Sequence, residues 1–215
     1  MIQDGLEAIM RLAPVIPVVI IEDAKDAVPL ARALVKGGLK AIEITLRTEA
    51  ALEAIRLVAQ EVEGAVAGVG TVLTPAQYEQ AAKAGAKFAV SPGATPRLLD
   101  AVEEMGIAPL PGIATASEAM ALIERGYRYA KFFPAEASGG APFLSSIASP
   151  LPQLKFCPTG GITPEIAPHY LKLPNVLCVG GSWMLKPAVI KAKDWESVTQ
   201  VASMAAALSK PATAG

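Results

Sequence analysis

The sequence has few of the residues on which several classes of protein depend. Its 215 residues include two cysteines, one histidine and 5% aromatic residues, and the formal net charge is −1. So few cysteines and histidines argue against a disulfide scaffold or a histidine-rich metal site. Because there is neither a basic excess nor a long run of like charge, we expect neither nucleic acid nor a membrane surface as a partner.

The apolar runs are too short to span a bilayer. One near the N-terminus, LAPVIPVVII, is interrupted by Pro14 and Pro17 and followed by the charged stretch EDAKD, which is not typical of a secretion signal. Cys157 and Cys178 lie in short apolar runs without CxxC spacing, which favours buried, reduced thiols over a disulfide. These features predict a soluble, cytoplasmic protein.

Strand-like and helix-like stretches alternate along the chain. Eight short apolar or β-branched runs recur, and alanine-rich stretches with helical spacing lie between most of them; the runs are VIPVVII, KAIEIT, AVAGVG, KFAVS, IAPLPGI, RYAKFF, KFCPTG and NVLCVGG. This pattern predicts a (β/α)₈ TIM barrel in a single domain over residues 1–215. We expect an extra helix at residues 3–12, a terminal helix at 195–208 and a disordered tail at about 209–215. The alternative is an open doubly wound sheet, but the turn after the first run lacks the GxGxxG pattern typical of one.

Polar residues interrupt these strands mainly at their carboxyl ends, where barrel enzymes place their active sites. They are Glu43, Thr45 and Arg47 in IEITLRT, Thr71 in GVGT, the Ser91–Gly93 turn, Lys131 in RYAKFF, Thr159 in PTGGI and Ser182 in GGSW. Each has an ordinary explanation when taken alone: a lysine can reach solvent, a threonine can cap a helix, and an arginine can pair with a neighbouring acid. Their placement at one end of the predicted barrel favours a shared site.

Two glycine pairs follow the last two strands. Gly160 and Gly161 follow the seventh run, and Gly180 and Gly181 precede Ser182 after the eighth. Barrels of this kind often hold a phosphate there, because glycine leaves backbone N–H groups open to an anion and a helix N-terminus adds partial positive charge. Tight turns alone would explain one pair, but two adjacent pairs favour phosphate binding.

Lys131 has three candidate roles: a charge partner, an anchor for an anion, or a covalent nucleophile. As a nucleophile it must be neutral, which burial among aromatic neighbours would favour. A neutral lysine condenses with a ketone to an imine, which permits cleavage of the neighbouring carbon–carbon bond in a β-hydroxy ketone. Glu43 is then the better proton acceptor, since the only histidine, His169, lies in a predicted helix. The metal-dependent route needs clustered ligands, and the sequence has no HxH, HxxxH or paired-carboxylate strand end, so no metal or cofactor is expected.

Seven motifs together resemble the 2-keto-3-deoxy-6-phosphogluconate (KDPG) and 4-hydroxy-2-oxoglutarate (KHG) aldolase family. They run in order from about residue 14 to 187: AIEITLRT, GVGTVL, FAVSPG, PLPGIAT, KFFPAEASGG, KFCPTGGI and VLCVGGSWM. The resemblance implies a Schiff-base lysine at Lys131 and a proton-transferring glutamate at Glu43.

The same resemblance implies roles for further residues. It places the substrate carboxylate at Arg47 and Thr71, and it implies that Pro92, Phe133 and Thr159 line the pocket. The implied phosphate-binding residues are Gly160, Gly161, Gly181 and Ser182. The family is typically trimeric, so the resemblance also implies a homotrimer. Val69 departs from the GAGT form common in the family, and its bulk beside Thr71 would alter the fit of the pocket modestly.

The resulting hypothesis is a metal-independent lyase of the Entner–Doudoroff pathway. It would cleave KDPG to pyruvate and glyceraldehyde 3-phosphate, and it would also act on 4-hydroxy-2-oxoglutarate. Two alternatives stay open on the residues alone. One is an isomerase or synthase of another phosphate-binding barrel family, with Lys131 acting only as a charge. The other is a non-catalytic protein that binds phosphorylated sugar acids.

Overall fold

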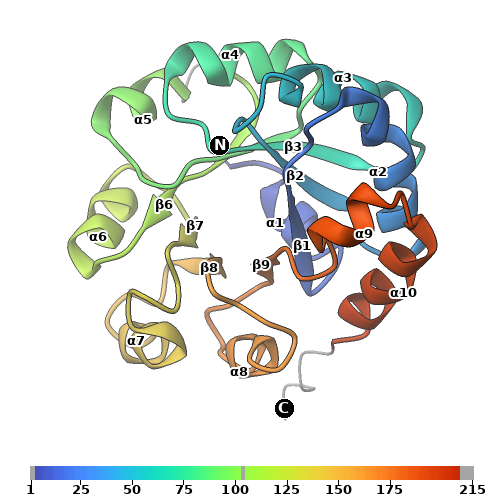
Figure 1. The fold of residues 1–215 in the computed structure, drawn as a ribbon. Coiled ribbons are helices and arrows are strands. Elements are labelled where there is room, and N and C mark those ends of the chain that lie inside the picture. The colour runs from blue at the N-terminus through green and yellow to red at the C-terminus, as the bar shows by residue number, and fades with distance from the viewer. Residues whose placement is uncertain (1–2, 103–104, 209–215) are drawn as a thin grey trace.

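The strands form two parallel sheets that are ringed by helices (Figure 1). A computed structural model describes residues 3–102 and 105–208. The first sheet has six strands in the order β5-β4-β3-β2-β1-β9, and the second has three in the order β6-β7-β8. The strands are β1 (Val15–Val19), β2 (Ala41–Thr45), β3 (Val66–Gly70), β4 (Phe88–Val90), β5 (Ala108–Leu110), β6 (Gly112–Ile113), β7 (Tyr129–Phe132), β8 (Lys155–Pro158) and β9 (Val179–Gly181).

The predicted closed eight-stranded barrel is therefore wrong, although every predicted run contains a strand. The fifth run is split into β5 and β6 at Pro111, whose ring carries no N–H for a ladder hydrogen bond. Where β8 approaches β9, two isolated bridges, Phe156 to Val176 and Thr159 to Gly180, replace a continuous ladder. The fold is a curled six-stranded half-barrel completed by a separate three-stranded sheet.

The helices follow the strands as the alternating pattern predicted. They are α1 (Leu6–Met10), α2 (Ala27–Lys36), α3 (Ala51–Glu61), α4 (Pro75–Lys83), α5 (Pro96–Val102), α6 (Ala116–Glu124), α7 (Gly140–Ile147), α8 (Ala167–Leu171), α9 (Pro187–Lys191) and α10 (Trp195–Ala206), with a 3₁₀ turn η1 (Ala24–Asp26) before α2. Capping boxes at Thr74 and Thr115 start α4 and α6. The expected initial and terminal helices are α1 and α10, each shorter than predicted, and the expected tail lies outside the described residues. In the described parts of the chain, no helix is both long and apolar enough to cross a membrane.

Two hydrophobic clusters fix the strands in place. The larger lies between the strands and the helices, and the smaller fills the space that the strands enclose. The smaller cluster includes Leu6 and Met10 of α1 together with Phe88, Leu110 and Tyr129 from the strands. Since these residues are buried on the inner side, α1 closes the amino end of the strands and leaves their carboxyl ends for polar side chains.

Gln3 joins the two sheets at that closed end. Its amide nitrogen donates to the carbonyl oxygens of Pro109 on β5 and Tyr129 on β7, at 2.8 and 2.7 Å. Its amide oxygen accepts from the backbone N–H groups of Arg128 and Tyr129, at 2.8 and 3.0 Å. One buried side chain thus satisfies backbone groups that a continuous ladder between these strands would otherwise have paired.

Candidate active site

A buried amine and a buried carboxylate meet between the two sheets. Lys131 is on β7 and Glu43 is on β2, and their side chains are only 6% and 4% exposed. Lys131 Nζ lies 3.3 Å from Glu43 Oε1. Removing two charges from water is expensive unless they are paired, so each side chain makes the burial of the other tolerable. The strands hold these two side chains in contact although 88 residues separate them in the sequence.

Two of the predicted pocket residues, Phe133 and Pro92, lie near Lys131 or the strand position paired with it. Lys131 Nζ lies 5.1 Å from the centroid of the Phe133 ring, within the range of a cation–π contact. Lys131 pairs in register with Gly112 on the neighbouring strand β6. Gly112 has no side chain, and a Cβ atom built on it would lie 2.3 Å from the carbonyl oxygen of Pro92. The Pro92 backbone therefore lies next to the strand position that pairs with Lys131.

The two residues predicted to bind the substrate carboxylate, Arg47 and Thr71, also come together. Arg47 Nε donates to Thr71 Oγ1 at 3.3 Å, and Arg47 is exposed just beyond the end of β2. Thr71 has φ of 60°, in the left-handed region that β-branched residues rarely adopt. An exposed guanidinium tied to a hydroxyl in this way is suited to hold a carboxylate at the mouth of the site.

Val69, which departs from the GAGT form common in the family, does not place its side chain in the pocket beside Thr71. It is fully buried in the cluster between strands and helices, whereas the neighbouring position, Gly70, faces Glu43. Alternation along β3 puts these two residues on opposite faces. The expected effect of Val69 on the pocket is therefore wrong, because its side chain packs on the helix side.

The two glycine pairs lie side by side. The bridge between Thr159 and Gly180 aligns the segment after β8 with the segment at the end of β9. Gly160 and Gly161 have φ of 107° and 77°, so their backbone conformation alone favours glycine. At Gly181 a Cβ atom would lie 1.9 Å from the ring of Trp183. The conformation and packing explain these three glycines without a ligand, and Ser182 is exposed beside them.

The helices that follow the glycine pairs contribute less than expected. They are α8 and α9, which begin only at Ala167 and Pro187 and have five residues each. A short helix that starts several residues after the glycines cannot direct its N-terminus at an anion held by them. Phosphate binding here would depend on the backbone N–H groups of the two segments and on Ser182.

Sequence reasoning missed Glu136 near these segments. A Cβ atom at Gly161 would lie 2.9 Å from the Glu136 side chain, and Glu136 accepts a hydrogen bond from the Tyr170 hydroxyl. Burial, and then the Glu136 contact, raise the pKa of the Tyr170 hydroxyl. The negative charge of the Glu136 carboxylate would repel a bound phosphate. The hydrogen bond from Tyr170 occupies one of the two carboxylate oxygens of Glu136. Glu136 lies within the motif KFFPAEASGG, but no role was assigned to it, because its contact with Tyr170 joins the loop after β7 to α8.

Thr159, the remaining pocket candidate, is buried at the end of β8, one strand away from Lys131. Its hydroxyl lies 3.5 Å from the carbonyl oxygen of Cys157, the residue aligned with Lys131. Neither Cys157 nor Cys178 forms a disulfide in the structure, and both are buried, as predicted.

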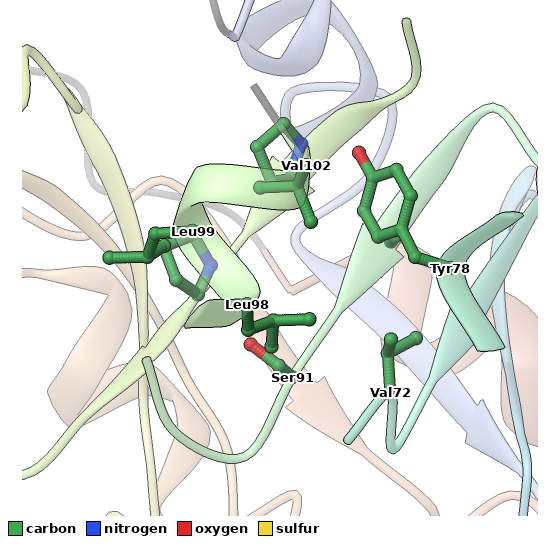
Figure 2. A pocket seen from close by; sticks show the side chains of 9 residues that line it. Val72, Tyr78, Ser91, Leu98, Leu99 and Val102 are labelled. Carbon is green, nitrogen blue, oxygen red and sulfur yellow. The ribbon is translucent and has the colours of Figure 1, made fainter. Parts of the chain in front are cut away.

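The cavity in Figure 2 is not part of this site. It lies on the helix side of β3, β4 and β5, among Val72, Tyr78, Leu98, Leu99 and Val102, and its volume is about 10 Å³. That is room for about one water molecule at most. The Tyr78 and Ser91 hydroxyls donate to the carbonyl oxygens of Ile107 and Gly93, so neither is directed to a ligand.

Comparisons with known proteins agree with this geometry. A family model described as KDPG and KHG aldolase matches residues 6–201. A 2-dehydro-3-deoxy-phosphogluconate aldolase from Pseudoalteromonas atlantica is 51% identical over 194 residues, which make up 90% of each chain. The KDPG aldolase of Zymomonas mobilis, solved with 3-phosphoglycerate, has a TM-score of 0.91 and 49% identity, covering 98% of this chain and 99% of that one.

A further solved structure bears on the chemistry. It is a KDPG aldolase from Legionella pneumophila in which pyruvate was captured at low pH as a covalent carbinolamine. Its TM-score is 0.91 at 44% identity, covering 94% of this chain and 98% of that one. A carbinolamine is the adduct of an amine with a carbonyl carbon, the first stage on the way to an imine.

Proposed function

Because this chain belongs to the family of KDPG and KHG aldolases, we propose that it is a class I, metal-independent aldolase. It cleaves 2-keto-3-deoxy-6-phosphogluconate to pyruvate and glyceraldehyde 3-phosphate, and it acts also on 4-hydroxy-2-oxoglutarate. The observation that carries the proposal is the buried contact of 3.3 Å between Lys131 Nζ and Glu43 Oε1. It pairs a nucleophile that must lose a proton with a group that can accept one.

The reaction begins at the amine. Transfer of a proton from Lys131 to Glu43 leaves both groups neutral, which a buried site favours over two separated charges. The amine nitrogen then bonds to C2 of the substrate to form a carbinolamine. Glu43 returns its proton to the carbinolamine hydroxyl, which leaves as water, so the protonated imine and the Glu43 carboxylate remain. The positive imine nitrogen is the electron sink that the cleavage step requires.

Glu43 performs the later proton transfers. As a carboxylate it accepts the proton of the C4 hydroxyl, directly or through a water molecule, while the C3–C4 bond breaks and its electron pair forms the enamine. Glyceraldehyde 3-phosphate leaves. The enamine carbon takes a proton back from Glu43, and hydrolysis of the imine releases pyruvate and restores Lys131.

The surrounding residues hold the two ends of the substrate. Arg47 and Thr71 bind the carboxylate, and Pro92, Phe133 and Thr159 line the pocket. Gly160, Gly161, Gly181 and Ser182 bind the phosphate through backbone N–H groups and the serine hydroxyl. The hydrogen bond from Arg47 to Thr71 and the alignment of Thr159 with Gly180 support these assignments.

The setting proposed for the enzyme follows from the same resemblance. The enzyme is a single-domain cytoplasmic homotrimer in Entner–Doudoroff sugar acid breakdown, and its partner is a phosphorylated 2-keto acid rather than nucleic acid or a membrane.

A coupled assay for pyruvate release from KDPG tests the proposal. We expect equal amounts of pyruvate and glyceraldehyde 3-phosphate in the presence of a metal chelator, and no turnover by Lys131→Arg, because a guanidinium stays protonated and cannot form the imine. Substantial activity in Lys131→Arg would favour a role for Lys131 as a charge alone. Ligand binding without pyruvate release would favour a binding protein.

A further inference from the structure

Gly70 occupies a position where the backbone does not require glycine. It is the last residue of β3, it pairs in register with Thr45 of β2, and its φ lies outside the left-handed region. An alanine would adopt the same strand conformation without strain. The reason for glycine at this position must therefore lie in what a side chain would contact.

The group that a side chain would contact is the Glu43 carboxylate. A Cβ atom at Gly70 would lie 2.3 Å from Glu43 Oε1, 2.6 Å from Cγ and 2.8 Å from Cδ. Real Cβ atoms essentially never approach another heavy atom closer than 3.0 Å. The blocked oxygen, Oε1, is the one that lies 3.3 Å from Lys131 Nζ. The carboxylate of Glu43, the proposed proton acceptor, thus occupies the space that a side chain at Gly70 would fill.

Glu43 has little freedom to move elsewhere. Gly68, which is aligned with Glu43, also lacks a side chain, and a Cβ atom there would lie 2.2 Å from the ring of Phe88 on β4. The inner surface of β3 is therefore covered from both sides, by Phe88 from one neighbouring strand and by Glu43 from the other. Phe88, Glu43 and Lys131 are all buried, so a methyl group at Gly70 must displace the carboxylate.

We propose that Gly70 is a positioning residue: its missing side chain holds open the place from which Glu43 reaches Lys131 and the reacting carbon. This inference depends on the proposed aldolase function. It predicts that Gly70→Ala leaves the nucleophile intact but impairs the proton transfers of Glu43. Since positioned acid–base catalysis contributes about 10²–10⁴-fold, we expect Gly70→Ala to slow turnover by at least about 10-fold and at most as much as Glu43→Gln.

The test compares Gly70→Ala, Glu43→Gln and the double variant Gly70→Ala/Glu43→Gln. Two rates are measured: pyruvate release from KDPG, and exchange of the pyruvate methyl protons with deuterated water, which reports protonation of the enamine. If Gly70 acts through Glu43, Gly70→Ala lowers both rates in the wild-type background but lowers neither by more than about 2-fold in the Glu43→Gln background. Equal fold-losses in both backgrounds would overturn the proposal.

Shortening the glutamate gives a second test. Alanine at position 43 removes Cγ, Cδ and Oε1, the three atoms that the methyl group would meet, so Gly70→Ala/Glu43→Ala should match Glu43→Ala alone within about 3-fold. A further loss of more than 10-fold would overturn the proposal. This comparison also decides the matter if Gly70→Ala alone does not fold, because the clash is absent from both proteins.

Gln80→Ala is the control. Gln80 is exposed on the outer helix α4, so the substitution should leave both rates unchanged. Absence of pyruvate release by the wild-type protein would count against the proposed function. If the wild type is active, loss of the expected dependence on Glu43 would count against the role of Gly70 alone.

Discussion

The six-stranded sheet and the three-stranded sheet differ in the chemical groups that they bring to the candidate site. The six-stranded sheet carries Glu43 on β2, with Arg47 and Thr71 just beyond β2 and β3. The three-stranded sheet carries Lys131 on β7 and, just beyond β8, Thr159. The proposed nucleophile and the proposed base thus belong to different sheets, and neither sheet alone contains a reactive pair.

The two sheets meet differently at their two ends. At the carboxyl end the contacts between them include the buried pair of Lys131 and Glu43 and the bridge from Thr159 to Gly180. At the amino end Gln3 of the N-terminal segment bridges β5 and β7 through backbone hydrogen bonds. The proposed reactive pair, Lys131 and Glu43, therefore lies at one end of the contact between the two sheets, and the structural bridge made by Gln3 lies at the other end. The substitutions below test this division, beginning with the largest expected effect.

Glu43→Gln removes the base that the six-stranded sheet supplies. We expect a loss of about 10²–10⁴-fold in kcat for KDPG cleavage, because glutamine cannot accept the C4 hydroxyl proton. Lys131 on the other sheet is retained but has lost its proton acceptor, so borohydride should still trap pyruvate on Lys131, at a lower rate than in the wild type. Loss of trapping together with turnover would mean that the two sheets do not divide the chemistry as described.

Arg47→Met removes the carboxylate anchor of the same sheet. A hydrogen bond to a charged group contributes about 1.5–3 kcal/mol, so kcat/KM should fall by about 10–100-fold. Steady-state kinetics measures the change. Arg56→Met on the outer helix α3 is the control, since the Arg56 side chain hydrogen-bonds with Glu53 and Gln60 of the same helix. Equal losses in both variants would assign the effect to general destabilisation.

Gln3→Ala breaks the bridge at the amino end. Four hydrogen bonds to buried backbone groups are lost. We expect the free energy of unfolding to fall by roughly 2–4 kcal/mol and Tm to fall by roughly 4–16 °C. Calorimetry measures the shift, with Gln80→Ala at an exposed position of α4 as control. Turnover per folded molecule should stay within about 2-fold; a large loss of turnover would mean that the two ends are coupled.

Glu7→Gln should have the smallest effect, on the pH dependence of stability. The hydrogen bond from Tyr129 and then that from Arg11 lower the pKa of the Glu7 carboxyl below its usual value. A lowered pKa in the folded state gives stability that is present at neutral pH and lost as the pH falls through that pKa. The Tm difference between wild type and Glu7→Gln should therefore be greatest near neutral pH and shrink in acid. A Tm difference that stays constant across this pH range would contradict this assignment.

Much of the site could be predicted because charged residues in apolar strands are conspicuous. Lys131 and Glu43 were both expected at strand ends, and the structure brings them into contact. The capping boxes at Thr74 and Thr115 are likewise short local patterns that depend only on neighbouring residues and can be recognised in a sequence.

The features that could not be predicted depend on contacts between distant parts of the chain. The break between β5 and β6 depends on the strand ladder at Pro111, although the prolines in IAPLPGI are a signal that could have warned of it. The side on which Val69 lies depends on the register of β3, and a one-residue change in register exchanges the two faces. Gln3 lies in no motif, and Gly70 lies in GVGTVL without a role of its own, since the importance of both residues depends on groups on other strands.

The most direct test of the account is borohydride reduction of the protein in the presence of pyruvate, followed by mass spectrometry of its peptides. The account predicts one reduced pyruvate adduct, located on Lys131 and absent from Lys131→Arg. An adduct on another lysine, or an unmodified Lys131 in a preparation that turns over KDPG, would contradict the claim that this buried amine forms the covalent intermediate.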